Sequence, residues 1–318
     1  MVLSRGFSVP CGGISIAVSE PLQLVVVCTS TPGSVFQVFG LQRGFPKLAS
    51  FGSCARVDPI PLSSVVGQVT FPPWEHATLL VADTNGNRVQ EVNVRDKRLV
   101  HTWFDGAVDR PQAIAASRNL VAVFERGSQR ISVFSCLMGL RVKQIPCGAV
   151  GPRGLLLTGN GTMAAVDGDE KRLSVFKTSN WALDRHIGTS LAGVTAGCGG
   201  VVEVSGRFVV TTGDNLTVLS DAGQHVLGGR GSAIAQFQGC AGLATATLGH
   251  PLSTSLFVVE RSRFQVFETS ILDKVNTQAL TAGSAGDVGD VFSLPAESEV
   301  RAQYPPPSLA ETESGETR

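Results

Sequence analysis

Apolar residues in this chain fall into short runs that come in pairs, and a few polar residues join the two runs of each pair. The stretch LLVADTNGNRVQEV, residues 79–92, is a clear example, with Thr-Asn-Gly-Asn between its two runs. β-Branched residues alternate with other types in each run, and Gly, Asn, Asp or Ser stands at the bend. This pattern predicts two short strands joined by a hairpin. We find no long segment with the 3.6-residue period of a helix.

The second run of each pair recurs along the chain. Its six copies are VFQVF, RVQEV, RISVF, RLSVF, NLTVL and RFQVF, which begin at residues 35, 88, 130, 172, 215 and 263. A further short apolar strand is predicted upstream of most pairs, and a fourth strand downstream. Four strands in a repeat of about 40–45 residues is the size of a propeller blade. In the second repeat the first strand is predicted at residues 63–69, followed by an insertion, TFPPWEH.

Six such repeats predict an all-β fold, a six-bladed β-propeller of four-stranded antiparallel blades over residues 1–295. The segment FSVP at residues 7–10 returns as FSLP at residues 292–295, so we expect head and tail to meet and close the ring. Closure protects the strand edges from pairing with other chains. Residues 296–318 contain YPPP and five Glu, without apolar periodicity, and are predicted to be a disordered tail.

Composition narrows the function classes. Lys and Arg together equal Asp and Glu at 26 each, so binding of nucleic acid by bulk charge is not expected. The seven Cys are odd in number and form no CxxC pair, which argues against a disulfide framework and a zinc finger. No apolar run has the length of a signal peptide core or of a membrane span. We therefore expect a cytoplasmic protein with no membrane partner.

The stretch at residues 79–92 resembles the signature of NHL-repeat β-propellers, through Asp83, Asn87, Arg88 and Val89. Such propellers often follow a ring finger and a coiled coil in ubiquitin ligases, and some bind RNA on their loop face. Since this chain has neither ring-finger cysteines nor heptads, the resemblance implies a link to ligase assemblies only through partners. Partial matches, each an acid with an Arg, occur at Asp167 and Arg172, Glu125 and Arg130, and Glu260 and Arg263.

The oxygen-bearing residues between Asp83 and Asn87 also suggest a calcium loop. Such a loop needs a bidentate Glu at its twelfth position, where this chain has Val94, and helices on both sides. A hairpin turn supported by the Asn side chains explains the same residues without an ion. We therefore expect no metal here and no cofactor elsewhere. The acidic turn VDGDEKR, residues 166–172, has the same explanation.

The Arg residues that recur at one position of the repeat are expected to lie on one circle. They could bind phosphates or a partner's carboxylates. We favour instead an internal role, in which each Arg pairs with the acid across its own hairpin, as Arg88 would with Asp83. We expect the pair to be exposed, and an exposed pair contributes only about 0–1 kcal/mol, so its removal should be mild.

The residues that open the innermost strands are small, and this suggests close packing around the axis. Cys11, Cys198 and Cys240 share this position, where buried Cys is favoured over a metal-binding ring of thiols. A metal-dependent lyase or lactonase would need His, Glu or Asn converging on the axis. The innermost strands carry one acid, Glu203, and the five His lie at unrelated repeat positions. Enzymatic activity is therefore not expected, although it stays open as an alternative.

The sequence favours a non-catalytic binding scaffold with a protein partner, and binding of single-stranded RNA is the alternative. The turns between second and third strands should gather on one face, with Trp74 of the insertion as a nearby aromatic anchor. The residues predicted to bind the partner are Asn85, Asn87, Arg88, Arg126, Arg130, Asp169, Lys171, Arg261, Arg263, Trp74 and His76.

Overall fold

The computed structural model describes twelve stretches of the chain and contains only strands, turns and loops within them. A compact unit spans Met1–Asp273, and the predicted tail, 296–318, lies outside the described residues. The described stretches are 5–8, 13–29, 34–42, 45–53, 60–147, 152–167, 171–188, 199–220, 223–228, 230, 236–248 and 253–268. Within them, no helix has the length and apolarity needed to cross a membrane.

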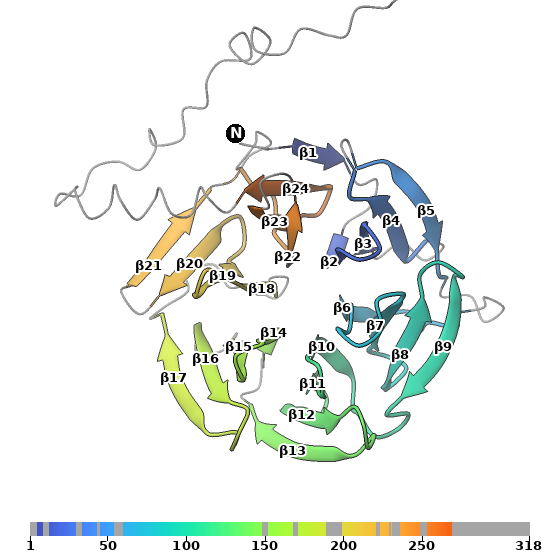
Figure 1. The fold of residues 1–318 in the computed structure, drawn as a ribbon. Coiled ribbons are helices and arrows are strands. Elements are labelled where there is room, and N and C mark those ends of the chain that lie inside the picture. The colour runs from blue at the N-terminus through green and yellow to red at the C-terminus, as the bar shows by residue number, and fades with distance from the viewer. Residues whose placement is uncertain are drawn as a thin grey trace, which may run out of the picture. The chain divides into compact units, whose positions relative to one another are not determined.

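Twenty-four strands form six four-stranded antiparallel sheets arranged in a ring, as predicted (Figure 1). Each sheet is one blade. Blades 1 and 2 contain β2 (Gly13–Ser19), β3 (Leu24–Thr29), β4 (Phe36–Gly40), β5 (Lys47–Phe51), β6 (Val66–Thr70), β7 (Thr78–Asp83), β8 (Arg88–Asn93) and β9 (Arg98–Trp103). Blades 3 and 4 contain β10 (Pro111–Ala116), β11 (Leu120–Glu125), β12 (Arg130–Ser135), β13 (Arg141–Pro146), β14 (Pro152–Leu157), β15 (Thr162–Asp167), β16 (Arg172–Lys177) and β17 (Leu183–Ile187). Blades 5 and 6 contain β18 (Val201–Val204), β19 (Arg207–Thr211), β20 (Leu216–Ser220), β21 (Gly223–Leu227), β22 (Gly242–Leu248), β23 (Ser253–Val259), β24 (Arg263–Glu268) and β1 (Arg5–Ser8).

The second and third strands of the blades read as continuous apolar runs because both of their faces are covered. All six residues of β7 are buried, whereas β13 is exposed at five of its six positions. The core consists of clusters between neighbouring blades. Leu79 and Val92 of blade 2, for example, pack with Val26 and Phe36 of blade 1.

The ring closes through the N-terminal strand. β1 is the outermost strand of blade 6 and pairs antiparallel with β24, with Phe7 opposite Phe264 (Figure 1). The expectation that the two ends of the propeller meet is therefore confirmed in part. The expectation that blade 6 takes its fourth strand from the residues after β24 is wrong. The segment FSLP, residues 292–295, lies outside the described residues.

Small residues on the innermost strands allow close approach at the axis, as predicted. A Cβ atom on Gly67 would overlap the carbonyl of Gln112 in the next blade, and one on Gly154 would overlap the carbonyl of Gly199. Cys240 is buried, and Cys11 and Cys198 lie outside the described residues.

We expect Gly154→Ala to lower the free energy of unfolding by about 1–3 kcal/mol, because the new methyl group forces two backbones apart. Chemical denaturation measures this loss. Gly159→Ala is the matched control, since a Cβ atom there meets no neighbour within 4 Å. An equal effect of the two changes would contradict close packing at the axis.

Candidate functional site

One face of the ring is formed by the turns between second and third strands together with the linkers that enter the innermost strands. We call it the hairpin face. Backbone hydrogen bonds join the turns to the linkers, for example from Asn85 N to Val65 O at 3.4 Å and from Arg126 N to Arg110 O at 3.1 Å. Antiparallel pairing places all of these segments at the same end of their blades.

A buried carboxylate fixes the turn in three blades. Asp83, Glu125 and Glu260 close the second strands of blades 2, 3 and 6, and each is 0% exposed. Each forms an ion pair with the Arg that begins the third strand, directly after the turn. The pairs are Arg88–Asp83 at 2.9 Å, Arg130–Glu125 at 3.1 Å and Arg263–Glu260 at 3.0 Å. The predicted pairing across the hairpin is confirmed in these blades.

Each carboxylate also holds the linker that enters its own blade. Its oxygens accept a hydrogen bond from the backbone N–H of one linker residue, at distances of 2.7–3.0 Å. They also accept a hydrogen bond from the side chain two positions after the Arg. We call each such arrangement of acid, Arg, polar side chain and linker N–H a clasp. The members are Asp83, Arg88, Gln90 and Ser63 in blade 2; Glu125, Arg130, Ser132 and Asp109 in blade 3; and Glu260, Arg263, Gln265 and Gln238 in blade 6.

The expectation that these pairs are exposed is wrong for their acids. The linker covers the carboxylate and shields it from water. The hydrogen-bond donors of the clasp therefore have to compensate the cost of burying its charge. In blade 2 the Arg88 guanidinium also donates to the carbonyl of Pro61, at 2.6 Å. The Arg side chains keep partial exposure, 25% for Arg88 and 16% for Arg263.

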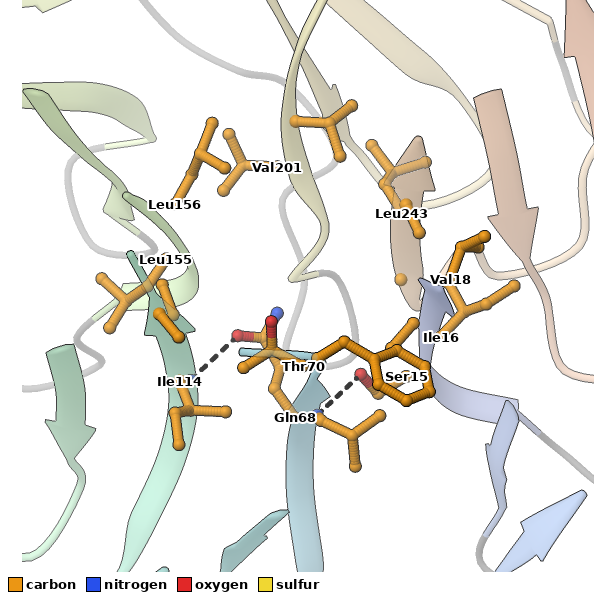
Figure 2. A pocket seen from close by; sticks show the side chains of 18 of the residues that line it. Ser15, Ile16, Val18, Gln68, Thr70, Ile114, Leu155, Leu156, Val201 and Leu243 are labelled. Atoms are coloured by element: carbon orange, nitrogen blue, oxygen red, sulfur yellow. Dashed lines mark hydrogen bonds between the residues drawn. The ribbon is translucent and has the colours of Figure 1, made fainter. Parts of the chain in front are cut away.

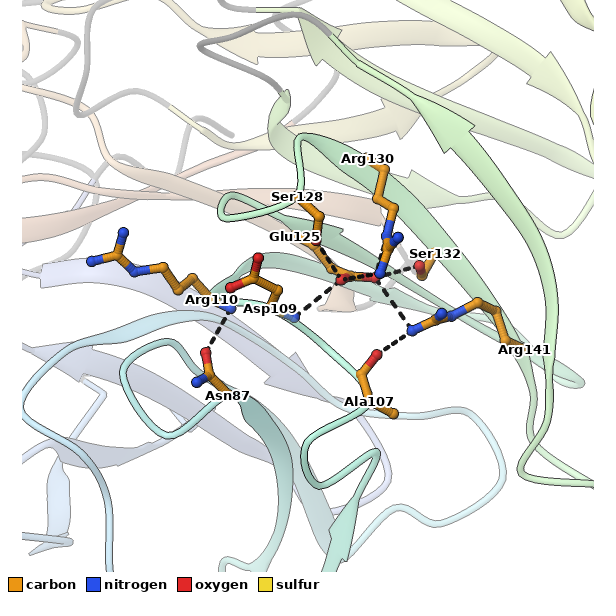
Figure 3. Close-up of polar contacts among 9 residues, drawn as sticks. All are labelled: Asn87, Ala107, Asp109, Arg110, Glu125, Ser128, Arg130, Ser132 and Arg141. Atoms are coloured by element: carbon orange, nitrogen blue, oxygen red, sulfur yellow. Dashed lines mark hydrogen bonds and ion pairs between the residues drawn. The ribbon is translucent and has the colours of Figure 1, made fainter.

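Blade 3 uses a second Arg in its clasp. Arg141 lies 3.7 Å from Glu125 and donates to the carbonyl of Ala107, as Figure 3 shows. Its guanidinium also lies over the ring of Phe134, 5.3 Å from the centroid. No sequence signal pointed to this residue, because it opens the fourth strand, outside the recurring acid and Arg positions of the hairpins.

The electrostatics of the blade 3 clasp favour the ionised acid. Burial alone would raise the pKa of Glu125, but the hydrogen bonds from Arg130, Ser132, the Asp109 backbone and Ser128 together hold its pKa below the ordinary value of 4.5. Stability from this clasp is therefore fully present above the pKa of the unfolded carboxyl. It is lost as the pH falls through the lower pKa of the folded state.

We expect the free energy of unfolding to decrease on acidification below about pH 4.5, in part through Glu125. Denaturation series at several pH values measure this slope. Glu125→Gln should flatten it, because the amide does not titrate. An unchanged slope in that variant would show that Glu125 keeps its ordinary pKa.

The two Asn of the blade 2 turn contact linkers. Asn87 adopts a left-handed conformation, φ 52°, which Asn tolerates. Its side-chain oxygen accepts the N–H of Arg110, at 2.9 Å, in the linker to blade 3 (Figure 3). Asn85 donates to Ser64 at 2.9 Å. The turn thus joins its own blade to the next one.

The structure brings most of the predicted partner-binding residues to the hairpin face but not all. Asn85, Asn87, Arg126, Lys171 and Arg261 are exposed there, whereas the clasp residues Arg88, Arg130 and Arg263 are half-buried. Asp169 lies outside the described residues.

The two residues of the insertion lie elsewhere, so their predicted place beside the hairpin face is wrong. The loop of Trp74 and His76 joins β6 to β7, and Thr70 pairs with Leu80 at that end of the blade. Asp83 and its turn are at the other end of β7. Trp74 packs against the core between blades 2 and 3, and His76 is exposed.

A cavity of about 180 Å³ lies on the axis and is lined by all six innermost strands (Figure 2). Gln68 crosses it. Its amide donates to Gly199 O of blade 5, at 2.7 Å, and accepts Ile114 N of blade 3, at 3.2 Å. The polar side chains of the described lining are Ser15, Gln68, Thr70 and Thr245. No group of three or more His, Cys, Asp or Glu that could hold a metal occurs among the described residues.

Six four-stranded blades around an axis define the class of the protein as a six-bladed β-propeller. No protein-family model matches the chain, and a search of the curated proteins finds no match. The fold is established by the arrangement of the six sheets. The NHL resemblance stays a prediction from the residues of blade 2.

Proposed function

We propose that the protein is a non-catalytic scaffold of the NHL type that binds a partner protein through its hairpin face. The observation that carries this proposal is the combination of fixed turns and exposed polar groups. Clasps and linker bonds hold the turns, so a partner would meet a surface that loses little conformational freedom on binding. A link to ubiquitin-ligase assemblies would then run through that partner.

The exposed charges of this face favour a partner that carries carboxylates. Arg110, Arg126 and Arg261 are exposed, and Lys171 joins them from blade 4, whereas the exposed acids of the described part of this face are Asp105 and Asp109. Arg guanidiniums bind carboxylates through paired hydrogen bonds. The described part of this face has no exposed aromatic side chain on which bases could stack, and this disfavours single-stranded RNA.

Affinity capture with matched variants tests this proposal. Charge reversal at Arg88 or Arg130 is unsuitable, because it would place a second acid against a buried carboxylate. We therefore use Arg126→Glu with Arg261→Glu, which alters exposed side chains. Arg95→Glu with Lys97→Glu, in the β8–β9 turn at the other end of blade 2, is the control.

We expect the hairpin-face variant to lose a partner that wild type and control retain. Equal recovery by all three proteins would contradict the proposal. Binding of single-stranded RNA at low salt that weakens steeply with salt, and is lost in the hairpin-face variant, would favour RNA instead.

A further inference from the structure

The turn between β12 and β13 exposes three large apolar side chains together. Leu137 is 87% exposed, Met138 63% and Leu140 61%. We call residues 137–140 the apolar tip. Val142 follows on β13 at 43%, and the other large apolar residues exposed in the described chain are single side chains on strands or linkers, at 45–53%. Scattered exposure of that kind is ordinary, whereas a contiguous apolar group marks an interaction site.

The apolar tip is an ordered projection. Gly139 adopts φ 63°, and its N–H donates to Ser135 O at 2.9 Å. Ser135 N donates to Leu140 O, and Cys136 N to Asn119 O in the β10–β11 loop, both at 2.9 Å. Burial raises the pKa of Cys136 to about 11, so the thiol at the base of the turn is uncharged at neutral pH.

The apolar tip lies away from the hairpin face. β12 begins at Arg130 of the clasp and ends at Ser135, so the tip is at the opposite end of this strand, roughly 17 Å away. A contact there would leave the hairpin face accessible. The tip therefore requires an explanation other than the partner proposed above.

Exposed cations lie on the segments next to the apolar tip. Arg118 lies in the β10–β11 loop, which is hydrogen-bonded to the base of the tip. Lys143 lies on β13, the strand that follows the tip. Arg141 points back to the clasp instead. In the described loops of blades 2 and 3 at this end and the strands that follow them, the exposed cations besides Arg141 are Arg95, Lys97, Arg98, Arg118 and Lys143, and the exposed acids are Glu75 and Asp96.

We propose that the apolar tip inserts into an anionic phospholipid surface, with the exposed cations of the neighbouring segments against the headgroups. Apolar side chains on a projecting turn suit the acyl region below the headgroups, and the excess of cations complements their negative charge. A peripheral contact of this kind needs no span.

Co-sedimentation with vesicles tests this proposal on the full chain. The probes are vesicles of phosphatidylserine with phosphatidylcholine and vesicles of phosphatidylcholine alone. The tip variant is Leu137→Ser with Met138→Ser and Leu140→Ser, which leaves the core intact because all three side chains are exposed. Its control is Leu48→Ser with Val226→Ser, exposed apolar residues of blades 1 and 5. Arg118→Glu tests the charge.

We expect wild type and control to sediment with the phosphatidylserine vesicles, more weakly as salt is raised, and to show little binding to phosphatidylcholine alone. The tip variant should lose at least roughly tenfold in partitioning, and Arg118→Glu should lose a smaller factor. Equal partitioning of wild type and tip variant overturns the proposal. Failure of wild type to bind either vesicle also overturns it, and self-association of wild type that the tip variant lacks would then assign the tip to a protein contact.

Discussion

Arg88→Met is expected to lower the free energy of unfolding by about 3–5 kcal/mol. The substitution keeps the length and apolar stem of the side chain but removes the charge that compensates Asp83. Asp83 is 0% exposed, and its other donors, Ser63 and Gln90, are neutral. A carboxylate left without its cation in a site closed to water costs far more than the loss of an exposed ion pair. Chemical denaturation measures the difference.

Two matched variants make this prediction specific. Arg98→Met removes a pair with Asp96 in which both side chains are more than half exposed, and it should cost only about 0–1 kcal/mol. Arg130→Met should fall between the two, because Arg141 remains 3.7 Å from Glu125. Equal losses in all three variants would show that burial of the acid does not control the effect.

Deletion of residues 1–8 is expected to lower the free energy of unfolding by about 2–6 kcal/mol and to cause self-association. The deletion removes β1 and hence the hydrogen bonds of the four residue pairs with β24, at about 0.5–1.5 kcal/mol each. It also turns β24 into an unpaired edge, which can pair with another chain. Denaturation and light scattering measure the two effects.

A peptide of residues 1–10, added to the deleted protein, provides the control. It should restore stability and suppress self-association by pairing with β24. The same peptide with Gly6→Pro and Phe7→Pro should not, because proline lacks the backbone donor. Rescue by both peptides, or by neither, would contradict closure through β1.

The sequence predicted the elements whose signals are local. Second and third strands were recognised because burial on both faces imposes continuous apolar runs. Arg88 and Asp83 were paired because they face each other across one hairpin. Burial of the acid could not be predicted, since a linker some 20 residues upstream covers it through backbone groups, which carry no residue signature.

Non-local features were missed for the same physical reason. Pairing of β1 with β24 depends on backbone bonds between segments far apart in the chain, so the fourth strand of blade 6 was expected in the wrong place. Arg141 joins the blade 3 clasp through the reach of a long side chain. Trp74 was placed by sequence proximity to the blade 2 turn, although the strand between them separates the two ends of the blade.

Closure through β1 also sets the order of events during synthesis. The residues of β1 leave the ribosome about 250 residues before their partners in β24. At roughly 5–20 residues per second, β1 therefore lacks its partner strand for about 10–50 s after it has been made. Nascent chains would present open sheet edges to chaperones over this interval, and the propeller can complete its folding only when nearly all of its blades have been translated.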